Sequence, residues 1–224
     1  MLVGFDFAFG YPAEAGLPAG RALCARLASL VRDEAHGANN RFEVAGLLNR
    51  EIQAALGGGF SGPFWCHPSE RSYETLTRTC PVPFPPRIPA GRLAERRLRG
   101  RGIQSPWKLF TAGAVGSQTL LGLPAVHRLL ADPALASRAR IWPFETAWDQ
   151  AVGEDTIVIA EMWPSLVDCR AQPYPIKDQR QVAAVRDWAL DDPIALAAAL
   201  ARPADLAPDE ERAAREIEGW IAGA

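Results

Sequence analysis

The chain contains few lysines, histidines and cysteines, and it has no long apolar run. Only Lys108 and Lys177 are lysines among the 24 basic residues, and the 3 histidines and 4 cysteines form no complete set of zinc ligands. No apolar run approaches the roughly 20 residues of a membrane helix, and the first residues lack the pattern of a signal peptide. A net charge of −2 argues against a basic body that binds polyanions in general. We therefore expect a cytoplasmic protein that does not associate with membranes.

Strand and helix patterns alternate along the sequence. Residues 2–9 (LVGFDFAF) place apolar side chains on one face at a period of two, and residues 156–163 (TIVIAEMW) form a nearly continuous apolar run, typical of a strand buried on both faces. Residues 140–145 are a shorter candidate strand. This order predicts one α/β domain over residues 1–224, with a largely parallel sheet and flanking helices. Helices are expected over residues 20–34 and 41–56, from residue 113 onward with a second helix beginning near Pro124, and over 178–190, 192–201 and 208–222.

Residues 57–106 form a long stretch that is rich in proline, glycine and arginine and has little periodicity. Irregular segments of this length inside a domain commonly serve as lids or binding loops, so we interpret the stretch as an insertion. Its second half is basic, and two interpretations stay open: a solvated helix around residues 91–99, or an anion-binding surface in which Arg96 and Arg97 hold phosphate. The basic residues are Arg87, Arg92, Arg96, Arg97, Arg99, Arg101 and Lys108, against the single acid Glu95.

Acidic residues occur in or at the ends of the expected strands. Asp6 and Glu161 lie in the two strongest strand patterns, and Asp178 opens the next helix. Ligands of parallel sheets bind at the carboxyl ends of the strands, and hard cations prefer carboxylate oxygens. We therefore predict a site for one or two Mg²⁺ or Mn²⁺ ions on Asp6, Glu161 and Asp178, with Glu145 as a further ligand and Lys177 stabilising negative charge. The alternative is that these acids satisfy backbone donors or pair with arginines.

A glycine-rich turn at residues 113–119 offers donors for an anion. It lacks the Gly-Lys-Ser/Thr ending of a phosphate-binding P-loop, but Ser117 and Gln118 would lie at the start of a helix, where anions bind. Close helix packing is the alternative reason for such glycines. Trp107 and Lys108, at the end of the basic stretch, are candidates for stacking on a base and for binding phosphate.

Several blocks of the sequence, in their order, resemble an uncharacterised bacterial family of predicted nucleases with an RNase H-like fold. The opening strand and turn, GFDFAFGYP, carries the resemblance most clearly, and the AEMWPS block around Glu161 also matches. Some members of that family carry a label linking them to molybdopterin-guanine dinucleotide synthesis. The resemblance extends over residues 3–12, 62–65, 105–109, 113–124, 141–145, 160–165, 177–182 and 218–221.

The resemblance implies an RNase H-like sheet with Asp6, Glu161 and Asp178 near the active cleft. It implies a metal-dependent phosphodiester hydrolase acting on nucleic acid or a nucleotide, or an inactive remnant of one. The alternative is a non-catalytic binder of a nucleotide-like ligand, linked to molybdopterin-guanine dinucleotide metabolism. In the RNase H-like fold an antiparallel meander precedes the strand that opens this chain. We therefore expect either that the start of the sequence is assigned too late or that this version of the fold has lost the meander. A sheet without it would expose an edge strand, and we expect a homodimer through that edge.

Overall fold

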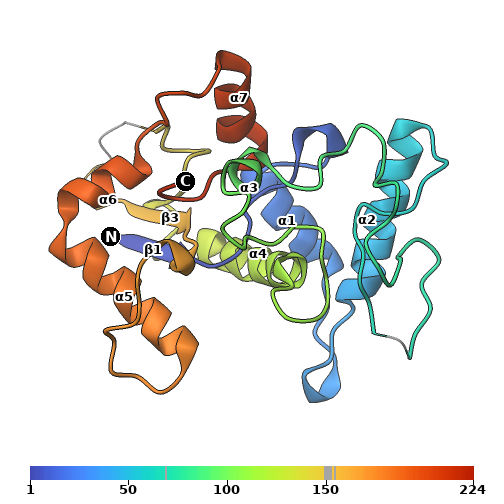
Figure 1. The fold of residues 1–224 in the computed structure, drawn as a ribbon, viewed down its shortest axis with the longest axis horizontal. Coiled ribbons are helices and arrows are strands. Elements are labelled where there is room, and N and C mark those ends of the chain that lie inside the picture. Colours follow the sequence, from blue (N-terminus) through green and yellow to red (C-terminus); the bar gives the residue numbers. More distant parts are fainter. Residues whose placement is uncertain (69, 149–152, 154) are drawn as a thin grey trace.

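A computed structural model describes residues 1–68, 70–148, 153 and 155–224. It is a mixed α/β structure in which β1 (Leu2–Phe5), β3 (Ile157–Glu161) and β2 (Ala139–Ile141) form a parallel sheet in the order β1-β3-β2. Figure 1 shows the sheet lying between the helices of residues 177–200 on one side and those of residues 20–56 and 115–131 on the other. The predicted α/β class and parallel pairing are confirmed, and the strands of the described residues form no antiparallel meander.

The register of the sheet brings the two acid-bearing segments together. Phe5 pairs with Glu161 at the carboxyl ends of β1 and β3, so that Asp6 leaves β1 beside the end of β3. All five residues of β3 are buried, which agrees with its continuous apolar sequence. On the other side of β3, Ile141 pairs with Ile159. The carboxyl edge of this small sheet is therefore where the expected acids converge.

Three helices build the amino-terminal half of the core. α1 (Gly20–Leu30) packs against α4 (Val115–Ala131), and α2 (Arg41–Leu56) also contacts α4. The prediction of a second helix near Pro124 is wrong, because α4 runs through the proline without a break. Proline removes one backbone donor from a helix, but this turn is buried and its neighbours Leu123 and Val126 are inaccessible to solvent, so packing compensates for the lost bond.

The carboxyl-terminal part is helical, as expected, but its last helix is shorter than the pattern indicated. α5 (Lys177–Asp191) and α6 (Pro193–Leu200) lie beside β1, whereas α7 (Pro208–Ala213) is followed by one π-helical segment over Ala214–Glu218. The backbone N–H of Ala222 then donates to the carbonyl of Glu161, 3.0 Å away. Within the described residues, each helix is too short or too polar to cross a bilayer. Short 3₁₀ segments occupy Ala13–Ala15, Ala35–Gly37 and Pro164–Leu166.

The stretch over residues 57–106 is irregular, as its composition predicts, with one short helix, α3 (Leu93–Arg97). Its first part packs onto α2, where the Asn49 side chain donates to the carbonyls of Phe64 and Thr75. Its second part lies against β3 and the carboxyl-terminal segment, and Ala94 and Leu98 enter the apolar cluster around β3. The insertion is therefore tied to the sheet near the ends of β1 and β3.

Candidate functional site

A polar cleft of about 480 Å³ lies at the carboxyl ends of β1 and β3. The end of the insertion and the start of α4 form one wall, and the segment after β3 and the start of α5 form the other. β1 and β3 are parallel and in register, so both end at the same edge of the sheet, and the cleft lies at that edge. Five of the residues expected from the sequence line this cleft: Asp6, Gln118, Glu161, Lys177 and Asp178.

Asp6 and Asp178 form the acidic part of the cleft. Asp6 follows β1 and Asp178 lies in the first turn of α5, and both side chains belong to exposed residues. Burial raises the pKa of Asp6 above its ordinary value, and the negative charge of Asp178 raises it further. Two neighbouring carboxylates repel each other, and a cation bound between them would relieve that repulsion.

Glu161 faces the same cleft, but a buried guanidinium already holds its carboxylate. Arg92, which is inaccessible to solvent, donates from Nη1 to Oε2 of Glu161 at 2.8 Å and from Nη2 to Oε1 at 2.7 Å. Such a paired arrangement of donors fixes both the position and the orientation of a carboxylate. Glu161 is therefore oriented by Arg92, and the guanidinium takes the place that a cation would occupy on that side.

Arg92 joins three distant parts of the chain. Its guanidinium also contacts Glu95 in α3 and donates to the backbone carbonyl of Glu218, 3.1 Å away. The Glu218 carboxylate in turn accepts from the backbone N–H groups of Ala13 and Leu93, at 3.0 and 2.6 Å. The insertion, β3 and the carboxyl-terminal segment are thus connected by one buried network of charged groups.

Burial controls the ionisation of this network. It lowers the pKa of Arg92, but Glu161 and Glu95 raise that pKa well above its ordinary value, so the guanidinium stays charged. Burial raises the pKa of Glu161 to about 7, because it outweighs the opposing effect of Arg92. Glu95, which shares the guanidinium with Glu161, raises the pKa of Glu161 further through its negative charge.

The donor set fits one divalent cation rather than two. Mg²⁺ is commonly held by one or two carboxylates together with phosphate oxygens and water, and Asp6 with Asp178 supply such a pair. A second ion would need Glu161, whose two oxygens are bound by Arg92. In the described part of the chain, no group of three or more His, Cys, Asp or Glu side chains is arranged around a common point for a metal.

Cationic and amide groups complete the cleft. Lys177 opens α5, and Arg101 comes from the end of the insertion. α5 has no side chain capping its first turn, and unpaired N–H groups at the start of a helix favour anions. The amides of Gln104, Gln118 and Gln181 line the same cavity. Acids that suit a cation and donors that suit a phosphate thus face one small volume.

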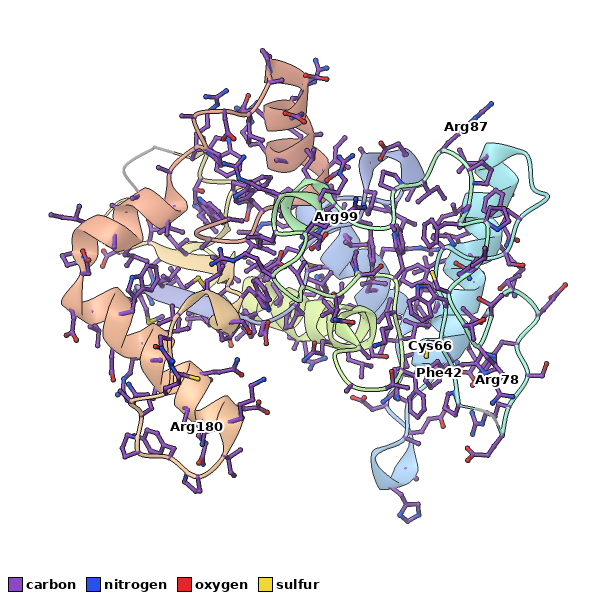
Figure 2. The ribbon with its side chains drawn as sticks, in the orientation of Figure 1. Phe42, Cys66, Arg78, Arg87, Arg99 and Arg180 are labelled. Carbon is purple, nitrogen blue, oxygen red and sulfur yellow. The ribbon has the colours of Figure 1, made fainter. Side chains whose placement is uncertain are left out.

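Three predicted site residues lie elsewhere and have other partners. Glu145, expected as a metal ligand, is outside the cleft, where it pairs with Arg21 at 2.5 Å and accepts from the backbone N–H of Ile141. Arg97 pairs with Asp205 at 2.7 Å and, together with Arg96, lines a different surface hollow beside α7. Arg87 also points outward at the rim of the molecule (Figure 2). Of the basic residues in the insertion, it is Arg101 that reaches the cleft.

The candidates around the glycine-rich turn serve mainly to hold structure. Trp107 is inaccessible to solvent, stacks on Tyr11 with ring centroids 4.8 Å apart, and donates from its indole to the carbonyl of Pro89. Lys108 donates to the carbonyl of Ala112 at 2.8 Å, and the Ser117 hydroxyl donates to the carbonyl of Leu109. The turn therefore positions α4, and Gln118 is the residue at its start that faces the cleft.

Arg92 and Glu218 are the important residues that sequence reasoning did not single out. Arg92 was one of several arginines in a basic stretch, and its spacing from Glu95 was the only local signal of a pair. Its partners Glu161 and Glu218 lie 69 and 126 residues away in the sequence. No motif predicts contacts at such separations.

Comparison with known proteins gives no match: no model of a protein family fits the chain, and neither a curated protein nor a solved structure similar to it was found.

Proposed function

We propose that the protein is a metal-dependent phosphodiester hydrolase with an RNase H-like arrangement, acting on a nucleic acid or a nucleotide. The observation that carries the proposal is the meeting of Asp6 and Asp178 with Lys177 and Arg101 in one cleft at the carboxyl edge of a parallel sheet. Carboxylates at that edge suit Mg²⁺ or Mn²⁺, and the two cationic side chains suit the phosphate on which such an ion acts.

In the hydrolysis, the oxygen of water forms a bond to phosphorus, the ester P–O bond breaks, and the departing oxygen takes up a proton. Asp6 and Asp178 would hold the ion, which when bound lowers the pKa of water and neutralises phosphate charge. Lys177 and Arg101 would bind the non-bridging phosphate oxygens as negative charge grows on them. Arg92 orients Glu161 in the lining of the cleft.

The test is titration calorimetry with Mg²⁺ and Mn²⁺, together with hydrolysis of bis-nitrophenyl phosphate. We expect Asp6→Asn and Asp178→Asn each to weaken metal binding by about tenfold or more. Loss of a group that only orients a metal ligand already weakens binding by about 10- to 100-fold, and these two residues would be ligands themselves. Glu145→Gln is the matched control, since it removes an acid outside the cleft. Absence of metal binding by the wild-type chain, or equal loss in the control, would contradict the proposal.

A second candidate is a binder of a nucleotide-like ligand without turnover, of the kind connected with molybdopterin-guanine dinucleotide metabolism. The specific observation in its favour is the guanidinium of Arg92 on Glu161, which leaves two carboxylates rather than three for metal ions. This candidate predicts that metal and nucleotide bind while no nitrophenol is released. Hydrolysis that disappears in Asp178→Asn would decide against it.

The outer edge of β1 supports self-association through that strand. The carbonyl of Met1 accepts from Val158 in β3, and the carbonyl of Phe5 accepts from Met162 just after β3. Because successive residues of a strand face opposite sides, the backbone N–H and C=O of Gly4 point to the outer side. An apolar groove of about 540 Å³ runs along this edge, and Val182 and Leu190 beside it are 66% and 73% exposed. A homodimer in which two copies of β1 pair would satisfy the edge and cover this surface. Sedimentation across a range of concentrations tests it, and a monomer throughout would exclude it.

A further inference from the structure

One wall of the cleft is flat and aromatic. Trp163 follows β3 and lines the cavity, while its remaining surface packs on the apolar cluster around β3. Its backbone is held, because its carbonyl accepts from the N–H of Leu166 at 3.0 Å. The backbone of Trp163 is thus held in a turn, and the indole keeps part of its surface exposed at the cleft.

Besides Trp163, the cleft has further lining groups that are not acidic. Ile103 and Ile221 add apolar surface to the cavity, and Gln104 and Gln118 bring amides to it from the insertion and α4. An amide carries both a donor and an acceptor, which is the pattern on the edge of a nucleobase. Aromatic rings bind bases by stacking, without strong preference for one base.

Resting on the proposed function, we infer that the cleft recognises a nucleobase as well as a phosphate, so that its ligand is a nucleoside phosphate whose base stacks on Trp163. The phosphate then lies toward Asp6, Lys177 and Asp178, and the amide of Gln118 faces the edge of the base. The amide of Gln104 is already held, because it donates to the carbonyl of Gly102 at 3.2 Å and accepts from Lys108 at 3.4 Å. Trp107, which was expected to provide the stacking surface, is buried in the core; Trp163 takes that role.

The experiment compares ligands that differ only in the base. Titration calorimetry in the presence of Mg²⁺ measures ribose 5-phosphate against the monophosphates of adenosine, guanosine, cytidine and uridine. We expect at least one nucleotide to bind about fivefold or more tightly than ribose 5-phosphate, the lower end of the gain from stacking one base. Trp163→Leu should abolish this difference, and Trp163→Phe should retain most of it, because phenylalanine keeps an aromatic face.

The matched control is Phe110→Leu, which changes an aromatic residue that is 39% exposed and does not line the cleft. It should leave the ratio of affinities unchanged. Circular dichroism of the Trp163 variants verifies that each is folded, and binding of ribose 5-phosphate by Trp163→Leu verifies that its cleft is intact.

The outcomes separate the inference from the function on which it rests. Equal affinity for ribose 5-phosphate and every nucleotide, with both bound in the presence of Mg²⁺, would overturn base recognition and leave the phosphate site standing. A nucleotide preference that persists in Trp163→Leu would overturn the role of Trp163. Failure of the wild-type chain to bind either class of ligand would overturn both proposals.

Discussion

Two cavities of similar size meet at Asp6, and their chemistry is opposite. The cleft of about 480 Å³ faces carboxylates, amides, Lys177 and Arg101, whereas the groove of about 540 Å³ along the outer edge of β1 faces mostly aliphatic side chains of α5 and α6. The same short strand borders both. The difference therefore arises from what lies opposite β1: the insertion and α4 on one side, and the apolar surface of α5 on the other.

Among the described residues, buried charge is stabilised by an ion-pair network on the side of the cleft and not on the side of the groove. In the cleft, Glu161 is held by a buried guanidinium, so removing Arg92 leaves its charge without compensation. In the groove, no comparable network stabilises the exposed apolar side chains, and each contributes independently. Substitutions on the two sides should therefore differ in the quantity that they change, namely stability in the cleft and association in the groove.

The largest effect is expected from Arg92→Ala. This change leaves Glu161 and Glu95 buried without their cation, and loss of one partner of a buried ion pair costs about 3–5 kcal/mol. Urea unfolding measures the loss. Arg97→Ala is the control, because its pair with Asp205 is at the surface and should be worth less than about 1 kcal/mol. Equal losses in the two variants would show that the buried network is not what distinguishes the cleft.

The next effect concerns the pH dependence of Glu161. Its pKa is raised from 4.5 to about 7 in the folded chain, so the folded state binds this proton more tightly than the unfolded state does. Protonated Glu161 therefore contributes to the free energy of unfolding fully below about pH 4.5, and this contribution is lost as the pH rises through about 7. Relative to Glu161→Gln, the wild-type chain should lose up to about 3 kcal/mol over that range. Chemical unfolding from pH 4.5 to 8 measures it. The opposite slope would mean that attraction by Arg92 outweighs burial.

On the groove side, Leu190→Lys should change association far more than stability. Leu190 is 73% exposed, and surface substitutions commonly change the free energy of unfolding by no more than about 0.5 kcal/mol. If two copies pair at β1, the added charge should shift the sedimentation profile toward monomer. Val82→Lys is the control, since Val82 is 93% exposed on the distant proline-rich surface. An equal shift in both variants would point to nonspecific aggregation.

The smallest effect is expected from Asp6→Asn, measured without metal. Because Asp178 and burial raise the pKa of Asp6, its charge opposes folding near neutral pH, and the amide should stabilise the chain by a few tenths of a kcal/mol, in the range of surface substitutions. Thermal unfolding at pH 7 measures the change. Addition of Mg²⁺ should then stabilise the wild-type chain more than the variant. A variant stabilised equally by Mg²⁺ would place the metal elsewhere.

Local patterns in the sequence predict most of the elements, and long-range contacts decide the site. The spacing of apolar residues locates α2 over Arg41–Leu56 as the structure has it, and the run before Glu161 identifies β3. The sequence predicts Asp178 in the first turn of a helix, as the structure has it, but it predicts Asp6 inside a strand over residues 2–9, whereas β1 ends at Phe5. It does not show that Arg92 is buried, because a buried arginine and its exposed neighbours occupy the same basic stretch. Likewise Pro124 suggested a new helix, although tertiary packing holds α4 continuous.

The network around Arg92 also bears on the order in which the molecule folds. The Glu218 carboxylate accepts from Ala13 across 205 residues of sequence, and Arg92 reaches Glu161 across 69. Closing loops of this length costs chain entropy that is recovered only when the contacts form, whereas the turns of α1 and α2 need only their neighbours. We therefore expect the walls of the cleft to form after the helices. Ending the chain before Glu218 would remove the carboxylate that accepts from Ala13 and Leu93, and we expect this change to disrupt the cleft.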